Sequence, residues 1–218
     1  MSAVQVAASI LNADLGALHD AVRRAEDAGV DRIHLDIMDG RFVPNITFGL
    51  ATVEALRSAT TLPFDAHLMV QEPSRWAARF AAAGCATVTI HVEAPEAHAG
   101  TLASIRAAGA AAGLAIDAGT PAEALGPFAG AIDLALVMTV KAGFGGQSYQ
   151  PEAAARIPAV RALLHEGAQI HVDGGIKAEQ AFDAARRGGS VLVAGTALYG
   201  AASMERAVQE IRAAVAAG

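Results

Sequence analysis

The sequence predicts an α/β protein folded as a (β/α)8 TIM barrel, with residues 1–218 forming one domain. Short β-branched runs alternate with alanine-rich helical stretches about eight times, and no Pro/Ser-rich linker or change of composition separates them. Runs such as Ile132–Val140 and Ser190–Ala194 are almost continuously apolar, as expected for parallel strands buried on both faces. These observations favour a closed barrel over a doubly wound sheet.

Strands are expected where apolar runs stand between turn residues, and helices where apolar residues recur three or four positions apart. The expected strands are Val4–Ile10, Asp31–Met38, Leu62–Met69, Ala86–His91, Gly113–Ile116, Ile132–Val140, Gln169–Asp173 and Ser190–Ala194. The expected helices are Ala13–Ala28, Ile46–Ser58, Pro73–Ala83, Glu96–Ala112, Pro121–Phe128, Pro151–His165, Lys177–Arg187 and Ala202–Ala216. Gly29 and Gly84 are stop signals, Glu72-Pro73 opens the third helix, and Thr120 is placed to cap the fifth.

Composition and charge exclude several classes of protein. A hydrophobic content of 53% indicates a large core, and a net charge of −6 with scattered Lys and Arg argues against a nucleic-acid partner. The single cysteine, Cys85, excludes an internal disulfide and suits a reducing compartment. The sequence offers no 18-residue apolar span and no basic-then-apolar leader, so we expect a cytoplasmic protein with no membrane partner.

The stretch Ile33–Phe48 carries the most specific chemical signal. It places His34, Asp36 and Met38 at every second position of an apolar run, so the three side chains share one face of a strand. A His and an Asp arranged in this way can reach one metal ion or one substrate. The alternative is a strand with one structural His and one capping Asp.

Polar residues elsewhere strengthen the metal interpretation, because active sites of such barrels lie at the carboxyl ends of the strands. The first strand ends in Ser9, the third carries Asp65 and His67, and the seventh ends in Asp173-Gly174-Gly175. Two imidazoles and two carboxylates make a mixed nitrogen and oxygen ligand set that suits Zn, Fe(II), Mn or Co. The predicted ligands of one divalent ion per subunit are His34, Asp36, His67 and Asp173.

Methionines and glycines gather at the same strand ends. Met38, Met69 and Met138 lie at the C-terminal ends of strands two, three and six, either as ordinary core residues or as a water-excluding cap over a reactive intermediate. The small-residue loops Val140–Gln147, Asp173–Ile176 and Ala194–Thr196 let backbone N–H groups approach a phosphate, although glycine also serves plain turns. Together they predict a phosphorylated substrate.

Five motifs in the right order and spacing resemble the ribulose-phosphate 3-epimerase family over essentially the whole chain. They are Ser9-Ile10-Leu11, the segment His34–Gly40 with Phe42–Asn45, Asp65–Met69, Gly143–Gln147 and Val172–Gly175. The resemblance implies a metal-dependent barrel that interconverts D-ribulose 5-phosphate and D-xylulose 5-phosphate in the pentose phosphate pathway. It implies Asp36 and Asp173 as the proton-transfer pair and the three methionines as the cap. The implied substrate contacts are Ser9, His67, Gly143, Phe144, Gly145, Gly146, Gly174, Gly175, Gly195 and Thr196.

The chemistry accounts for these residue types. Inverting a carbinol carbon beside a ketone requires a base and an acid on opposite sides, and Asp36 and Asp173 come from well-separated strands. A divalent metal would stabilise the developing enediolate as a Lewis acid. The remaining histidines have no constellation in the sequence and are expected to be surface or structural: His19, His91, His98, His165 and His171.

Two departures from the family pattern leave the substrate open. Lys141-Ala142 and Asp117-Ala118 stand where the family usually has Asn-Pro, and they are either tolerated loop changes or a shift toward a related tetrulose or hexulose phosphate. Lys141 could instead serve a Schiff-base aldolase, with Lys177 as the other lysine, but the His and Asp set would then have no role. A non-catalytic sugar-phosphate-binding barrel is a third hypothesis. A homo-oligomer is expected.

Overall fold

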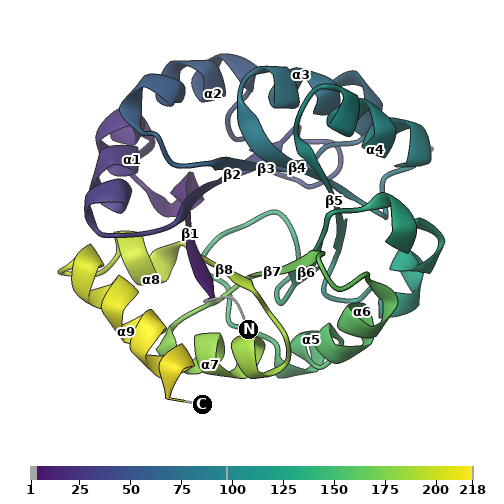
Figure 1. The fold of residues 1–218 in the computed structure, drawn as a ribbon. Helices are drawn as coiled ribbons and strands as arrows, with labels where there is room; N and C mark the ends of the chain where they lie inside the picture. The colour runs from purple at the N-terminus through teal and green to yellow at the C-terminus, as the bar shows by residue number, and fades with distance from the viewer. Residues whose placement is uncertain (1–3, 97, 218) are drawn as a thin grey trace.

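A computed structural model describes residues 4–96 and 98–217, which form a closed barrel of parallel strands in sequence order, β1 to β8 (Figure 1). The barrel prediction is therefore confirmed. The strands are β1 Gln5–Ser9, β2 Arg32–Met38, β3 Phe64–Met69, β4 Cys85–His91, β5 Ala111–Ile116, β6 Leu134–Met138, β7 Gln169–Asp173 and β8 Val191–Ala194. Within the described residues, no helix is long and apolar enough to cross a membrane.

Helices surround the barrel on the outside (Figure 1). The α-helices are α1 Leu18–Asp27, α2 Leu50–Leu56, α3 Ala77–Ala82, α4 His98–Ala107, α5 Pro151–Ala154, α6 Ile157–Leu163, α7 Ala178–Arg186, α8 Thr196–Tyr199 and α9 Met204–Ala216. The 3-10 helices are η1 Ile10–Asn12, η2 Leu15–Ala17, η3 Arg57–Ala59, η4 Pro73–Arg75 and η5 Ala122–Ala131. The one-turn helix α8 was not expected from the sequence.

Two expected helices differ because of proline. The segment expected as Pro151–His165 is divided into α5 and α6, and Pro158, which has no N–H to donate, stands in the first turn of α6. The segment expected as Pro121–Phe128 is a 3-10 helix with Pro127 inside it. Pro121, not Thr120, occupies its N-cap position, so the predicted Thr120 cap is wrong.

Two further helix boundaries were predicted too early or too late. The helix expected over Ile46–Ser58 starts only at Leu50, because Ile46 forms an antiparallel bridge with Asp39 in the loop after β2. The helix expected over Glu96–Ala112 is α4, and its last expected residues instead begin β5. Part of that expected segment, Ala97, lies outside the described residues. The loop that replaces the start of the second helix contributes to the rim.

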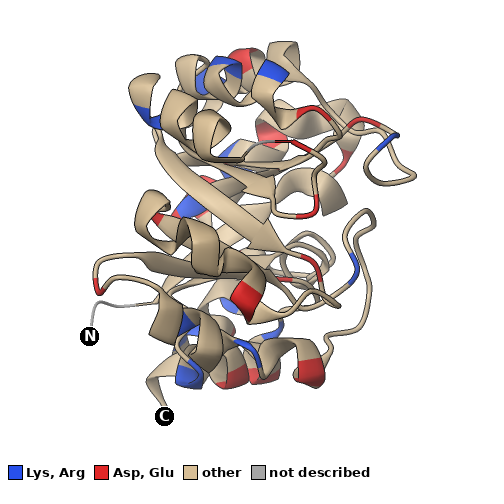
Figure 2. Cartoon of the chain, turned by 90° about the vertical axis from the view of Figure 1, so that its right-hand side faces the viewer, with Lys and Arg blue, Asp and Glu red and all other residues tan. Residues whose placement is uncertain are grey.

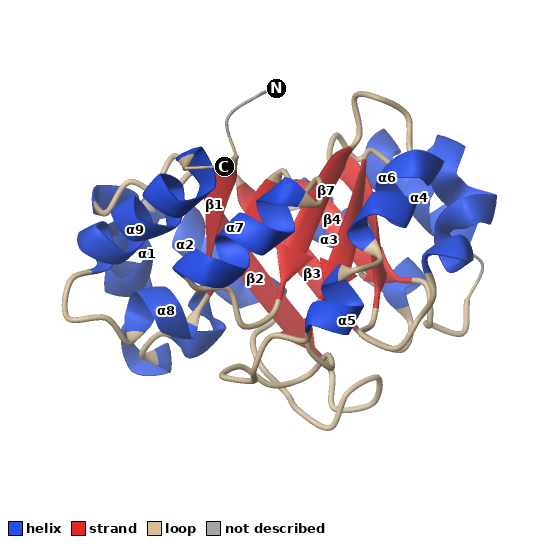
Figure 3. Ribbon diagram, turned by 90° about the horizontal axis from the view of Figure 1, so that it is seen from below, coloured by secondary structure: helices blue, strands red, loops and turns tan. Residues whose placement is uncertain are grey.

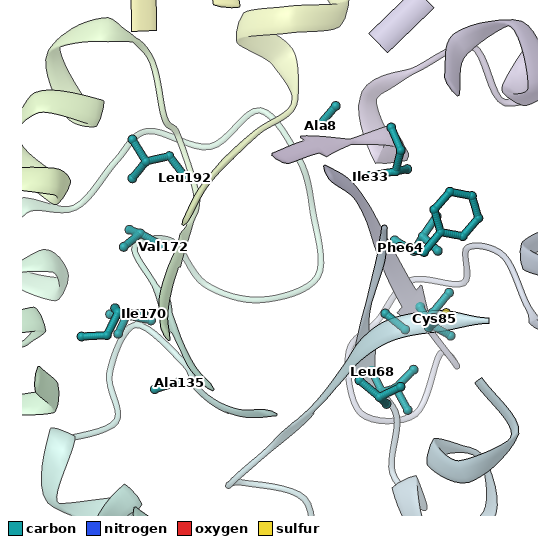
Figure 4. Packing of buried hydrophobic residues seen from close by; sticks show 14 of the residues in the cluster. Ala8, Ile33, Phe64, Leu68, Cys85, Ala135, Ile170, Val172 and Leu192 are labelled. Atoms are coloured by element: carbon teal, nitrogen blue, oxygen red, sulfur yellow. The ribbon is translucent and has the colours of Figure 1, made fainter. Parts of the chain in front are cut away.

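The alternation of side chains along the strands separates an apolar outer layer, packed against the helices, from a polar barrel interior. Strand residues such as Ile33, Phe64, Val172 and Leu192 are fully buried and point outward against the helices (Figure 4). Burial of this layer stabilises the barrel by roughly 1.5–3 kcal/mol per large side chain. The intervening residues of the same strands are thereby forced into the barrel.

A buried ion pair occupies the barrel interior. Arg32 on β2 donates from Nε and Nη2 to the Asp65 carboxylate at 2.6–2.9 Å, and Thr87 Oγ1 donates to the same carboxylate at 2.8 Å. His171 Nδ1 lies 4.0 Å from Asp65 Oδ2. Asp65 therefore belongs to the interior of the barrel and not to the rim set in which the sequence analysis grouped it.

The loops that follow the strands gather at the end of the barrel opposite the N-terminus (Figure 3). Acidic and basic residues are interspersed over the helices in Figure 2. The carboxyl ends of the strands and these loops together form the rim that the next subsection describes.

The buried pair gives a stability prediction. Arg32→Met leaves the Asp65 charge buried without its guanidinium, so we expect the free energy of unfolding to fall by about 3–5 kcal/mol in urea denaturation. Arg206→Met breaks the exposed Arg206–Glu210 pair and should cost less than about 1 kcal/mol. Equal losses in the two variants would contradict this account of the barrel interior.

Candidate metal and substrate site

Strand register brings the four predicted metal ligands together. Asp36 on β2 is directly paired with His67 on β3, and His34 lies two residues earlier on the same face of β2. Asp173 ends β7, which lies away from β2 around the barrel. One ligand atom from each of these residues lies within 4.8 Å of the other three.

The distances between these atoms are short. Asp36 Oδ1 lies 3.1 Å from His67 Nδ1 and 3.4 Å from His34 Nε2. Asp173 Oδ2 lies 3.8 Å from His67 Nδ1 and 3.9 Å from His34 Nε2. Two ligands of one zinc-sized ion, each about 2.0–2.2 Å from it, can be separated by up to roughly 4.4 Å. All four distances meet this condition.

Hydrogen bonds hold the two carboxylate-bearing segments. Ser9 Oγ donates to Asp36 Oδ2 at 2.6 Å, which leaves Oδ1 directed at the two histidines. Thr47 Oγ1 donates to the Asp36 carbonyl at 2.5 Å, so the loop after β2 is tied back to its strand. Thr139 Oγ1 contacts the carbonyl oxygens of Asp173 and Gly174 at 2.9 and 2.6 Å. These hydrogen bonds therefore hold the backbone of Asp36 and of Asp173 in place.

Electrostatics in the cluster favour positive charge. Burial opposes protonation of His34, yet Asp36 and then Asp173 raise the pKa of His34 to about 9. Burial and the Asp36 charge raise the pKa of Asp173 to about 7. Burial opposes ionisation of Asp36 as well, but its histidine neighbours, His34 first, hold the pKa of Asp36 well below the ordinary range. Two carboxylates in such confinement require a nearby cation.

The donor set fits a divalent metal ion. Both ring nitrogens of His34 are buried and have no hydrogen-bond partner among the described residues, although Nε2 faces the two carboxylates. A buried polar atom without a partner is costly, and a metal ion would satisfy it. The cluster can therefore hold a metal ion through His34, Asp36, His67 and Asp173.

One pocket at the rim joins most of the other predicted site residues. It is lined by Ser9, Asp36, Met38, Met69, Met138, Gly143, Phe144, Gly145, Gly146, Asp173, Gly174, Gly175, Gly195 and Thr196. His34 and His67 do not line it; the side chain of His67 is fully buried, with its nitrogens directed at Asp36 and His91. The predicted contact of His67 with substrate stays a prediction.

The three methionines meet at one side of this pocket. Met38, Met69 and Met138 are at most 4% exposed and belong to a single apolar cluster with Val43 and Val140. They line the pocket together with Asp36 and Asp173. They therefore form an apolar boundary beside the ionised groups.

The glycine loops approach one another too closely for side chains. A Cβ on Gly175 would lie 2.5 Å from the Tyr149 backbone nitrogen, and a Cβ on Gly145 or Gly195 would collide with Asn12. Gly175 also has φ +67°, which favours glycine. Asn12 also lines the pocket, between these loops, and was not among the predicted site residues because no motif or spacing in the sequence marks its position.

The two departures from the family pattern lie in different environments. Asp117 Oδ1 accepts from the backbone N–H groups of Ala118 and Ala142 at 2.8 and 2.9 Å, so the Asp117 carboxylate connects the loops after β5 and β6. Lys141, in contrast, lines the pocket. These contacts give Asp117 a structural role and leave Lys141 as the cation beside the glycine loop.

Comparisons with known proteins agree with this architecture. The model of the "Ribulose-phosphate 3 epimerase family" matches residues 5–199. Proteins named ribulose-phosphate 3-epimerase from Mycobacterium bovis and Bacillus subtilis are 42% and 41% identical, covering 95% and 96% of this chain and 91% and 98% of their own lengths. A crystal structure of 3-hexulose-6-phosphate synthase superimposes with a TM-score of 0.73 at 20% identity, covering 97% of this chain and 99% of that one, and this similarity concerns the fold.

Metal addition gives a test of the cluster. A Zn²⁺ concentration 100-fold above its dissociation constant should raise the free energy of unfolding by about 2.7 kcal/mol, and a chelator should remove this gain. Asp36→Asn removes the carboxylate nearest both imidazoles and should abolish most of the increment. His19→Gln, at an exposed histidine, should keep it. An equal increment in wild type and Asp36→Asn would place the ion elsewhere.

Proposed function

Because this chain belongs to the ribulose-phosphate 3-epimerase family, we propose that it interconverts D-ribulose 5-phosphate and D-xylulose 5-phosphate in the pentose phosphate pathway. The observation that carries the assignment is the pair Asp36 and Asp173, which come from distant strands and line one pocket. An epimerisation needs one group to remove the C3 proton and another to return a proton to the opposite face.

We assign the proton transfers to these two carboxylates. One removes the C3 proton from one face while the other, protonated, delivers a proton to the opposite face, and the roles exchange in the reverse reaction. The Ser9 hydroxyl orients Asp36, and the carbonyl contacts of Thr139 hold the end of β7 that carries Asp173. Both carboxylates are thereby held in the wall of the pocket that would take the substrate.

The four-residue cluster is the proposed site of one divalent ion per subunit, with Zn, Fe(II), Mn and Co as candidates because the ligands are two imidazoles and two carboxylates. When bound, such an ion supplies Lewis-acid stabilisation of the negative charge that develops on the substrate oxygens. The apolar methionine cluster excludes water from the same side of the pocket and so protects a carbanionic intermediate from unselective protonation.

The glycine loops are the proposed phosphate site. Gly143–Gly146, Gly174–Gly175 and Gly195–Thr196 converge on the pocket, and backbone N–H groups of such loops suit a phosphate. Lys141 adds a positive charge at the same wall. This lysine is the feature that keeps a related tetrulose or hexulose phosphate open as the substrate.

The setting of the enzyme is also a proposal. We place it in the cytoplasm, as one catalytic domain over residues 1–218, consistent with its unpaired buried Cys85. We also propose that the protein is a homo-oligomer.

Proton NMR of D-ribulose 5-phosphate in D₂O tests the reaction. Metal-loaded wild type should form xylulose 5-phosphate and introduce deuterium at C3, and chelator treatment should stop both. Asp36→Asn and Asp173→Asn should each slow the reaction by about 10²- to 10⁴-fold, because each removes one proton-transfer group. Asp20→Asn, at an exposed carboxylate, is the control and should retain the wild-type rate.

Two results would contradict the assignment. Exchange at an undiminished rate in Asp173→Asn would remove this residue from the chemistry. The metal-loaded wild type could also fail to exchange the C3 proton of ribulose 5-phosphate but exchange that of a tetrulose or hexulose phosphate. The substrate would then be one of these sugar phosphates, and Lys141 would be the residue to examine.

A further inference from the structure

A chain of three side chains leads away from the proposed metal cluster. His67 Nε2 lies 2.8 Å from His91 Nε2, and His91 Nδ1 lies 2.9 Å from Glu93 Oε2. The rings of His67 and His91 are inclined by only 24°, and their centroids are 5.0 Å apart, the separation of two imidazoles that meet end to end. Both histidines are fully buried, whereas the Glu93 side chain is 27% exposed.

Glu93 is anchored at its other oxygen. Its Oε1 accepts from the backbone N–H of Asp117 at 2.7 Å, so the carboxylate is fixed between the loop after β4 and the loop after β5. Burial opposes ionisation of Glu93, but the hydrogen bonds from His91, Thr120 and Asp117 lower its pKa to about 2. An ionised carboxylate only accepts hydrogen bonds.

The Glu93 carboxylate determines the direction of both hydrogen bonds that join it through His91 to His67. His91 must donate from Nδ1 to Glu93, so a neutral His91 has a bare Nε2 that can only accept. His67 must then donate from its own Nε2, and a neutral His67 has its lone pair on Nδ1. That nitrogen faces Asp36 Oδ1 at 3.1 Å, among the proposed metal ligands.

We propose that His91 and Glu93 are positioning residues that hold His67 in the tautomer whose Nδ1 lone pair is directed at the metal ion. The inference rests on the metal site of the proposed function. With the opposite direction of hydrogen bonding, His67 would carry a proton on Nδ1 and could not act as a ligand. Hydrogen-bond acceptors such as carboxylates and backbone carbonyls act in this way on metal-bound histidines in other sites, and their loss weakens metal binding about 10- to 100-fold.

The isosteric variant Glu93→Gln reverses the direction of the hydrogen bonds that join residue 93, His91 and His67. The backbone N–H of Asp117 can only donate, so the amide oxygen of the glutamine must remain there and its NH₂ group must face His91 Nδ1. His91 then accepts at Nδ1 and donates from Nε2, and His67 becomes protonated on Nδ1. We expect Zn²⁺ affinity, measured by competition with a chromophoric chelator, to fall about 10- to 100-fold.

Glu96→Gln is the matched control. Glu96 also accepts hydrogen bonds at both oxygens, from the backbone and hydroxyl of Ser74, but none comes from a histidine. It removes the same charge and should leave Zn²⁺ affinity within about twofold of wild type. Urea denaturation of both variants checks that the fold is retained.

Histidine ¹⁵N NMR of the Zn²⁺-loaded wild type reads the tautomers without any substitution. His91 should be protonated on Nδ1 and His67 on Nε2, and in Glu93→Gln without Zn²⁺ both assignments should reverse, since a His67 protonated on Nδ1 cannot bind the ion. A wild-type His91 protonated on Nε2 would overturn the inference, as would weaker binding in Glu93→Gln with the His67 tautomer unchanged, which would be an effect of charge alone. Wild type that binds no Zn²⁺ would instead refute the proposed metal site.

Discussion

Confinement of two carboxylates beside two imidazoles inside the barrel is the constraint on which the rest of the site depends. Asp36 is buried and Asp173 is only 15% exposed, and both lie within a few ångströms of the same pair of histidine nitrogens; anions so close together are unstable without a cation between them. The raised pKa of His34 reports the same negative potential. A divalent ion held by these residues would relieve this repulsion, and as a Lewis acid it would stabilise negative charge on the oxygens of the proposed substrate.

The barrel supplies the rigidity that this confinement requires. The outward-facing apolar residues lock the strands against the helices, and the inward-facing Arg32–Asp65 pair fills the interior with a compensated charge, so the pocket above it need not collapse onto the ligands. Ser9, Thr47 and Thr139 then attach the rim segments to this frame. Precision at the rim therefore derives from strands and not from loops.

Function is divided around the rim. The carboxylates, the methionine cluster and the glycine loops with Asn12 and Lys141 all line the pocket, and the loop after β4 carries Glu93. The distal groups Glu93 and His91 would act only through His67, since His67 separates them from Asp36. In the proposed site, the small residues would shape the pocket and metal binding would be adjusted from outside it.

The sequence by itself determined the barrel, the order of its elements and the four residues of the candidate metal cluster, because alternation along strands and short specific motifs are local properties. Helix boundaries at Leu50 and Ile157 depended on loop packing and on proline geometry, which periodicity does not report. Only the tertiary structure decided that Asp65 pairs with Arg32 and that Asn12 separates two glycine loops. It also decided that His91, which has no constellation along the chain, joins His67 to Glu93, since strand register and loop contacts set these distances.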